Sequence, residues 1–157
     1  MSLEEEAVHA LKKKGYDITT AESCTGGMIA STLINVSGIS EIYKEGYITY
    51  ANESKHRILG VKDETLKIYG AVSEQTAYEM ACGAAKASGA KTALVTTGIA
   101  GPGGGTEEKL VGLVYIGCYV NGNVTVSRNL FQGERLSIRK QTTIRALELL
   151  LECLNND

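Results

Sequence analysis

The sequence has 157 residues, of which 43% are hydrophobic and 22% charged, and its net charge at pH 7 is −2. This length suits one domain, residues 1–157, with a real hydrophobic core, and the composition excludes a disordered chain. Because no basic excess is available to neutralise phosphates along a duplex, we expect no nucleic-acid partner.

The cysteines and histidines argue against a metal site. They include no CxxC pair and only two histidines, so a structural zinc site is not expected. Reduced cysteines fit a cytosolic protein. The acidic start is unlike a signal peptide, and no apolar run approaches membrane-spanning length. We therefore expect a cytoplasmic protein without a metal, a cofactor or a membrane partner.

The first predicted element is a helix from Ser2 to Lys14. Ser2 and Glu5 fit a capping box, and Gly15 follows as a stop signal. Residues 16–20 carry β-branched and aromatic side chains and predict a strand. A turn that contains Ser23 comes next, and a short helix is predicted over residues 28–35.

The middle of the chain predicts two helices and two strands. Residues 46–50 predict a strand, and Asn52 is a good N-cap for a short helix that Gly60 closes. After a polar segment with no predicted structure, Ser73 opens a long helix that ends at Gly89. Residues 92–97 form a continuous apolar to β-branched run, which is typical of a central strand.

The last third predicts a hairpin and a helix. Asn121-Gly122-Asn123 joins the β runs 111–120 and 124–130, and Asn-Gly between β runs is the strongest short-range hairpin signal. The helix over 134–154 has an apolar stripe that includes Ile144. About five strands alternate with about five helices, so we predict the α/β class, as a single-domain layered α/β/α sandwich with a mixed sheet of roughly five strands.

The turn from Thr19 to Gly27 is the first stretch of chemical interest. Ser23 stands there at a sheet edge, close to the free N–H groups of the next helix. Gly26 and Gly27 have no Cβ, so a ligand can approach the backbone closely. The turn suits a nucleophile or an anion site. Taken alone, it favours the simpler interpretation, in which Ser23 and Thr25 only cap the helix.

The loop from Gly98 to Lys109 is the second such stretch. It follows the predicted central strand, and glycines occupy five of its first eight positions, so its backbone N–H groups can converge on an anion. It lacks the Gly-Lys-[Ser/Thr] of a P-loop and the GxGxxG of a dinucleotide fold. We interpret it as a ligand-binding loop, and the alternative is a flexible surface loop. The glycines expected to lie against the substrate are Gly98, Gly101, Gly103 and Gly104.

A nucleophilic Ser23 needs a base, and neither a Ser-His-Asp triad nor a Ser-x-x-Lys pattern supplies one. Lys55 lies in the first turn of a predicted helix, where the dipole opposes a cation and favours a lowered lysine pKa. A neutral lysine is a general base. Tyr50 could relay the proton or merely cover the core. Cys24 is either a rival nucleophile or a small buried apolar residue.

Four motifs that occur in one order carry a resemblance to a known family. They are Ala21–Gly27, Gly46–Lys55, Gly70–Ser73 and Gly98–Pro102. From about residue 4 to residue 153 the chain resembles the CinA C-terminal domain family, whose stand-alone members are nicotinamide-nucleotide amidases. The resemblance implies hydrolysis of the carboxamide of nicotinamide mononucleotide to nicotinate mononucleotide and ammonia, without a metal or cofactor.

The same resemblance implies the roles of the site residues. Ser23 would be the nucleophile, and Lys55 and Tyr50 would complete a Ser-Lys-Tyr arrangement. An arginine follows a Phe-x-Gly stretch in the family, and Arg135 is the first candidate here, with Arg139 second. A guanidinium suits bidentate contact with phosphate or with transition-state charge. The substrate would also contact Thr25, Gly26, Gly27 and the glycine loop, with Thr106, Glu107 and Lys109 as further candidates by position.

Two departures from the family pattern and three alternatives complete the expectations. Leu110 stands where many members have proline, which should loosen the loop without removing chemistry. The longer CinA proteins carry a further N-terminal domain with pyrophosphatase activity, which we do not assign to these residues. The alternatives are an amidase for another small amide, a nucleotide-binding module without turnover, and a protein-interaction module. We expect a homodimer, since single-domain enzymes with sites at a sheet edge are often dimers.

Overall fold

A mixed five-stranded sheet forms the middle layer of the computed structural model, which describes residues 1–157. Strands β1, β2 and β3 run parallel to one another, whereas β4 and β5 join as antiparallel neighbours. The mixed sheet that the sequence predicts is therefore confirmed. In the order β2-β1-β3-β4-β5, the strands span Tyr43–Ile48, Ile18–Glu22, Thr92–Gly98, Leu113–Val120 and Asn123–Leu130.

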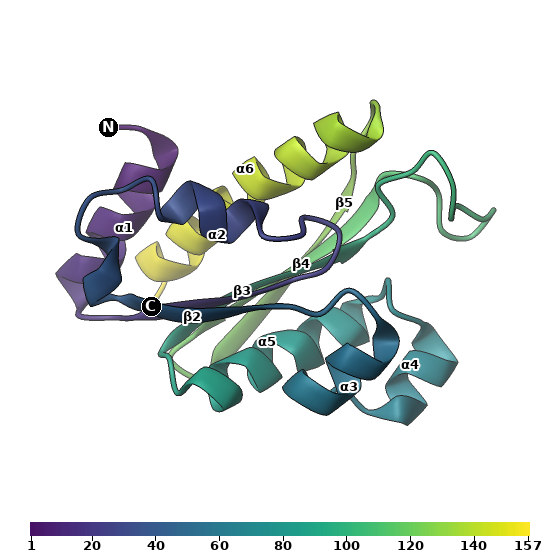
Figure 1. Cartoon of the computed structure of the whole chain (residues 1–157), viewed down its shortest axis with the longest axis horizontal. Helices are drawn as coiled ribbons and strands as arrows, with labels where there is room; N and C mark the ends of the chain where they lie inside the picture. The colour runs from purple at the N-terminus through teal and green to yellow at the C-terminus, as the bar shows by residue number, and fades with distance from the viewer.

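Helices cover both faces of this sheet (Figure 1). One face carries α1 (Leu3–Lys14), α2 (Met28–Leu33) and α6 (Arg135–Asn155). The opposite face carries α3 (Asn52–Leu59), α4 (Asp63–Tyr69) and α5 (Glu74–Ser88), and a short 3-10 helix, η1 (Ile39–Glu41), precedes β2. The predicted α/β/α sandwich is confirmed. None of the helices is both long and apolar enough to cross a membrane.

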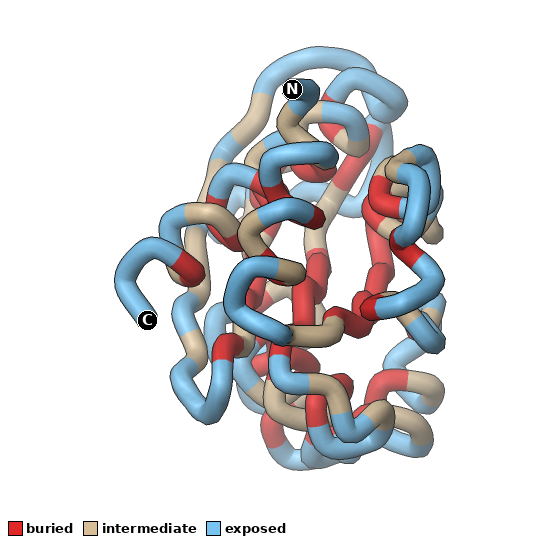
Figure 2. Tube along the Cα trace, turned by 90° about the vertical axis from the view of Figure 1, so that its left-hand side faces the viewer, coloured by how far each residue is buried: buried red, intermediate tan, exposed pale blue.

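Each helical layer buries its own hydrophobic cluster against the sheet. Leu94 and Ile116 face α1, α2 and α6, and their cluster includes Leu150 of α6. On the other face, Val95 packs in a cluster with Met80 of α5. Figure 2 shows the result, with buried segments gathered along the central strands and exposed segments around them. Burial of this apolar area is the main force that holds the helices on the sheet.

Local signals explain most of the element boundaries. The Ser2 and Glu5 capping box is formed as predicted, with both hydrogen bonds present. In the β4–β5 hairpin, Asn121 and Gly122 have φ values of 47° and 98°, as a two-residue turn of the Asn-Gly type requires. β3 lies at the centre of the sheet, as its apolar run predicts.

Three local predictions are wrong. The segment before Ser73 contains α4, whose polar sequence gives little periodic signal because Thr65 is its only buried residue. Asn52 is the first helical residue of α3, and the N-cap is Ala51, which makes no side-chain cap bond. Ile144 is 51% exposed on the outer side of α6 and so is not part of the buried stripe.

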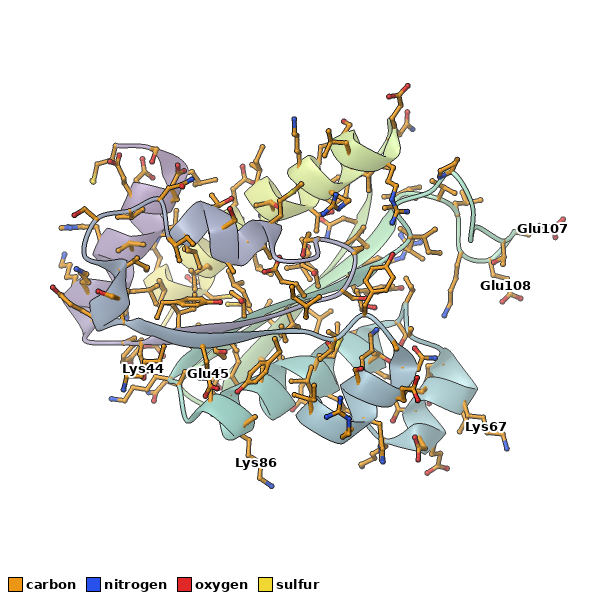
Figure 3. All side chains as sticks on the ribbon, viewed as in Figure 1. Lys44, Glu45, Lys67, Lys86, Glu107 and Glu108 are labelled. Atoms are coloured by element: carbon orange, nitrogen blue, oxygen red, sulfur yellow. The ribbon has the colours of Figure 1, made fainter.

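Gly83 of α5 lies directly under the end of α3. A Cβ at this position would lie 1.7 Å from the backbone oxygen of Leu59. Gly83→Ala should therefore force the two helices apart and lower the free energy of unfolding by about 3 kcal/mol, measured by urea denaturation. Lys86→Ala, on the solvent side of the same helix (Figure 3), is the control and should change it by less than about 0.5 kcal/mol. If Gly83→Ala and Lys86→Ala have equal free energies of unfolding, Gly83 and the backbone of Leu59 are not in close contact.

The chain topology places the candidate site at one edge of the sheet. From β1 the chain moves outward to β2, and it then passes over to β3 on the other side of β1. In open α/β sheets, ligands bind outside the carboxyl ends of the strands where such a reversal occurs. Ser23 follows β1 and the glycine loop follows β3, so both lie at this point.

Candidate active site

Ser23 is the first residue after β1 and lies in a tightly held turn. Its N–H donates to the oxygen of Thr96 at 3.1 Å, which extends the β1–β3 ladder, and its carbonyl accepts a hydrogen bond from Gly26 at 3.0 Å. Gly26 and Gly27 have φ values of +57° and +102°, which are strained for any residue with a Cβ. The two glycines thus let the chain turn sharply from the strand into α2, with Ser23 at the sheet edge.

Glu22, for which the sequence predicts no role, stabilises this turn by hydrogen bonds to the helix that follows it. Its side chain is buried and accepts hydrogen bonds from the N–H groups of Ile29 at 2.8 Å and Ala30 at 3.0 Å. It therefore caps α2, whose N-cap residue, Gly27, has no side chain to do so. A carboxylate is also favourable at the positive end of a helix.

The side chain of Thr25 belongs to the same hydrogen-bond network as Glu22. Its hydroxyl lies 2.6 Å from a carboxylate oxygen of Glu22 and 2.8 Å from the hydroxyl of Thr96, and the residue is fully buried. The predicted substrate contact of Thr25 therefore cannot come from its hydroxyl, which is held inside the protein. Its carbonyl is bonded to Met28 and Arg139, so Thr25 shapes the turn and does not face a ligand.

Lys55 approaches Ser23 from α3, on the other side of the turn. Its side chain is 1% exposed, and its Nζ lies 3.2 Å from the Oγ of Ser23. The same nitrogen donates to the backbone oxygens of Thr49 at 2.9 Å and Tyr50 at 3.2 Å. No carboxylate pairs with it, and burial lowers the pKa of Lys55 below its ordinary value of 10.5.

The two carbonyls give a neutral Lys55 a defined orientation. Carbonyl oxygens only accept hydrogen bonds, so an uncharged amine donates its two protons to Thr49 and Tyr50. Its lone pair is then left for the third neighbour, the hydroxyl of Ser23. This is the arrangement that a general base needs to take a proton from a serine.

Cys24 is the rival nucleophile. Burial raises the pKa of its thiol to about 11. The thiolate is the nucleophilic form of cysteine, so this thiol stays unreactive near neutral pH. The environment of Cys24 fits its alternative interpretation, a small buried apolar residue.

Tyr50 and Arg135 meet across the mouth of the site. One terminal nitrogen of Arg135 donates to the hydroxyl of Tyr50 at 3.1 Å, and the other donates to the backbone oxygen of Gly101 at 2.8 Å. The hydroxyl of Tyr50 thus pairs with Arg135, and only the carbonyl of Tyr50 contacts Lys55. Tyr50 is 62% exposed, so its ring is open to a ligand.

Arg139, the second arginine candidate, hydrogen-bonds to the backbone of the turn from Ser23 to Gly27, which we call the nucleophile turn. Its Nε donates to the oxygen of Cys24 at 2.9 Å, and a terminal nitrogen donates to the oxygen of Thr25 at 3.0 Å. Glu22 is hydrogen-bonded to the first turn of α2, and Arg139 is hydrogen-bonded to the carbonyls of the turn itself. The peptide groups that follow Ser23 are therefore fixed by two side chains. Of the two arginines, only Arg135 lines the cavity described next.

A cavity of about 260 Å³ opens beside Ser23. Its lining contains the guanidinium of Arg135 and the amine of Lys55, and no carboxylate. The backbone N–H groups of Cys24, Gly101, Gly103 and Gly104 make no hydrogen bond within the chain, so they are free for an anion. The lining residues are Ser23, Cys24, Tyr50, Lys55, Ala71, Val72, Thr97, Gly98, Ile99, Ala100, Gly101, Gly103, Gly104 and Arg135.

Several predicted contacts lie outside this cavity. Gly26 and Gly27 shape the turn but are not among the lining residues. Glu107 extends from the tip of the glycine loop into solvent (Figure 3). The hydroxyl of Thr106 accepts a hydrogen bond from the backbone N–H of Lys109, and the amine of Lys109 donates to the backbone oxygen of Tyr69. The loop is therefore anchored to α4, and the part that lines the cavity is Gly98 to Gly101 with Gly103 and Gly104.

Comparison with known proteins identifies the family. A model of the CinA C-terminal domain matches residues 1–154. The chain belongs to the CinA C-terminal domain family. The crystal structure of the competence/damage inducible protein CihA from Agrobacterium tumefaciens has a TM-score of 0.93 and 44% identity to this chain, covering 98% of it and 93% of that protein. That of a CinA superfamily protein from Klebsiella pneumoniae has a TM-score of 0.94 and 32% identity, covering 100% of both.

Some relatives in the CinA C-terminal domain family are much longer. The CinA-like protein of Kosmotoga olearia is 53% identical over 153 residues, which are 98% of this chain but 37% of that protein. A relative from Clostridium beijerinckii is 55% identical over 154 residues, and the chain spans 38% of its length. The similarity thus concerns one domain of these longer proteins.

Proposed function

We propose that the chain is an amidohydrolase that converts nicotinamide mononucleotide to nicotinate mononucleotide and ammonia through an acyl-enzyme on Ser23. The observation that carries the proposal is the buried amine of Lys55, whose Nζ lies 3.2 Å from the Oγ of Ser23 with carbonyl groups as its other partners. Membership of the CinA C-terminal domain family supports it, because the resemblance to the stand-alone members of that family implies this activity.

In this mechanism, neutral Lys55 takes the proton of Ser23 while Oγ attacks the carboxamide carbon. The oxyanion that forms accepts hydrogen bonds from free N–H groups, of which that of Cys24 is nearest in sequence to the nucleophile. Such a donor contributes roughly 3–4 kcal/mol in known enzymes. Lys55 then gives its proton to the leaving ammonia. A water molecule hydrolyses the ester, with Lys55 again as the base.

The charge of the cavity supports an anionic substrate. The guanidinium of Arg135 faces the cavity, no carboxylate does, and the glycine loop adds free N–H groups. Arg135 uses two of its five N–H groups on Tyr50 and Gly101, which leaves the others for a phosphate. In the proposed Ser-Lys-Tyr arrangement, the carbonyl of Tyr50 orients Lys55 and its hydroxyl orients Arg135.

The test is ammonia release from nicotinamide mononucleotide without added metal, beside the riboside that lacks the phosphate. The mononucleotide should be hydrolysed, and the riboside should show a kcat/KM at least about tenfold lower, because it cannot pair with Arg135. Binding of the mononucleotide without ammonia release would favour the binding-module alternative. Release from other small amides alone would indicate a different amidase.

Arg139→Gln tests whether the hydrogen bonds of Arg139 to the nucleophile turn matter for the rate. Without the guanidinium, the carbonyl of Cys24 loses its donor and that of Thr25 keeps only the N–H of Met28. The turn therefore loosens, and kcat should fall about tenfold to a hundredfold with little change in KM. Steady-state ammonia release measures both constants. Arg145→Gln, which breaks only the surface ion pairs with Glu148 and Glu152 on the same helix, is the control and should match the wild type. A rise in KM with unchanged kcat would instead place Arg139 against the substrate.

A further inference from the structure

Two cysteines lie against each other between the sheet and α6, away from the cavity that holds Ser23. Cys118 of β4 is fully buried in the hydrophobic cluster on that face of the sheet. Cys153, in the last turn of α6, packs against the same cluster and is partly exposed. The two thiols are close enough for each to shift the pKa of the other. Thr125, the partner of Cys118 across the β4–β5 ladder, lies beside Cys153.

The two thiols differ in their access to solvent. Cys153 and Thr125 line a surface cavity of about 270 Å³ between the β4–β5 hairpin and the end of α6. Cys118 is not among the residues that line it and is fully shielded. A small polar oxidant can therefore reach Cys153 from this cavity, and Cys118 lies directly behind it.

The two thiols also differ in their protonation. The neighbouring thiol of Cys118 lowers the pKa of Cys153 to about 7, although burial opposes this effect. The proximity of Cys153, together with burial, raises the pKa of Cys118 well above its ordinary value. The reactive thiolate thus forms at Cys153, beside a thiol that keeps its proton. Cys82 is also partly exposed but has its pKa raised by burial, so it is the natural control.

We propose that Cys118 and Cys153 form an oxidisable pair that a hydroperoxide converts into an intramolecular disulfide between β4 and α6. In the first step, the Cys153 thiolate attacks a peroxide oxygen and becomes a sulfenic acid, and hydroxide leaves when the oxidant is hydrogen peroxide. In the second step, the sulfur of Cys118 bonds to the sulfur of Cys153. The hydroxyl of the sulfenic acid leaves with the proton of Cys118 as water. One peroxide thus accepts the two electrons that the two thiols lose.

The new bond would tie the last turn of α6 to the centre of the sheet. The other end of α6 carries Arg135 and Arg139, which contact the cavity and the nucleophile turn. Because a disulfide restricts the unfolded chain, the oxidised protein should have a higher Tm than the reduced one.

The test treats the reduced chain of 157 residues with one equivalent of hydrogen peroxide and counts its free thiols. The count should fall from the four present in the chain to two, with a mass loss of about 2 Da for the two hydrogens. Peptide mapping should find the peptides of Cys118 and Cys153 joined. The Tm should rise, and reduction with dithiothreitol should reverse both changes. This result does not depend on amidase activity.

Three variants separate the roles of the two thiols. Cys153→Ser should slow the loss of the Cys118 thiol at least about tenfold, because a buried protonated thiol reacts slowly. Cys118→Ala should leave Cys153 to gain oxygen atoms in place of a disulfide, without a rise in Tm. Cys82→Ser should behave as the wild type. The proposal is overturned if wild-type Cys153 gains oxygen while Cys118 keeps its thiol, or if the disulfide formed contains Cys82 or joins two chains.

Discussion

Lys55→Met should lower the rate of ammonia release from nicotinamide mononucleotide by about a hundredfold to ten-thousandfold. A general base contributes a factor of this size, and no other base lies within hydrogen-bond distance of the Oγ of Ser23. Methionine has nearly the same length and is apolar, so it fills the buried space that the lysine stem occupies. The carbonyls of Thr49 and Tyr50 lose a donor, which costs about 1–3 kcal/mol of stability each if they stay dry. Steady-state kinetics and urea unfolding of the same samples separate the two effects.

The control for this variant is Lys67→Met, an exposed lysine of α4 that points into solvent (Figure 3). It makes the same substitution at an exposed position and should leave the rate unchanged. A Lys55→Met protein that keeps its rate would show that Lys55 is only a buried structural residue, and the proposed base would be wrong.

The pH dependence of the wild-type rate follows from the same lysine. The base acts only when it is neutral, so the rate should rise with pH and level off above the pKa of Lys55. Because burial lowers that pKa from 10.5, the plateau should begin at a lower pH than for an exposed lysine. A pH series of kcat from pH 6 to about 10 measures this. A rate that falls as pH rises would require a protonated lysine and would contradict the mechanism.

Ser23→Ala should reduce ammonia release at least as much as Lys55→Met, because the two residues act as one unit. The Oγ of Ser23 contacts only Lys55 within the chain, so the fold should be little affected. The cavity keeps Arg135 and the free N–H groups of the glycine loop, and the nucleotide should therefore still bind. Calorimetric titration of the variant beside its kinetics tests both statements.

Cys24→Ala is the matched control for Ser23→Ala, since it changes the neighbouring residue in the same turn. Its thiol is buried and protonated, so its loss should leave the rate within a factor of about three. If Ser23→Ala keeps its activity and Cys24→Ala loses it, the nucleophile is the cysteine.

The sequence predicts the layers of the fold and the positions of Ser23 and Lys55 for identifiable reasons. The apolar run of β3, the Asn-Gly hairpin and the capping box are local signals, and they agree with the final structure. The parallel order of β1 and β3 then brings the Ser23 turn and the glycine loop to one sheet edge. Lys55 stood out as a cation in the first turn of a helix, and burial is the largest cause of its lowered pKa.

Contacts between distant segments are what the sequence does not predict. Glu22 caps α2 from the end of a strand. It precedes the N–H groups of Ile29 and Ala30, which it accepts from, by seven and eight residues, and an N-cap or capping box does not have this spacing. Arg139 reaches the nucleophile turn across more than a hundred residues, so only the packing of α6 could assign its role. The pairing of the Tyr50 hydroxyl with Arg135, in place of Lys55, depends in the same way on where α6 begins.

The most direct test of the serine mechanism is to trap the intermediate. Wild-type protein turning over nicotinamide mononucleotide is quenched in acid, digested, and its peptides are fragmented in a mass spectrometer. We predict a nicotinate mononucleotide acyl group esterified to the side chain of Ser23. The same group on the side chain of Cys24, or on any other residue, would contradict the proposed mechanism.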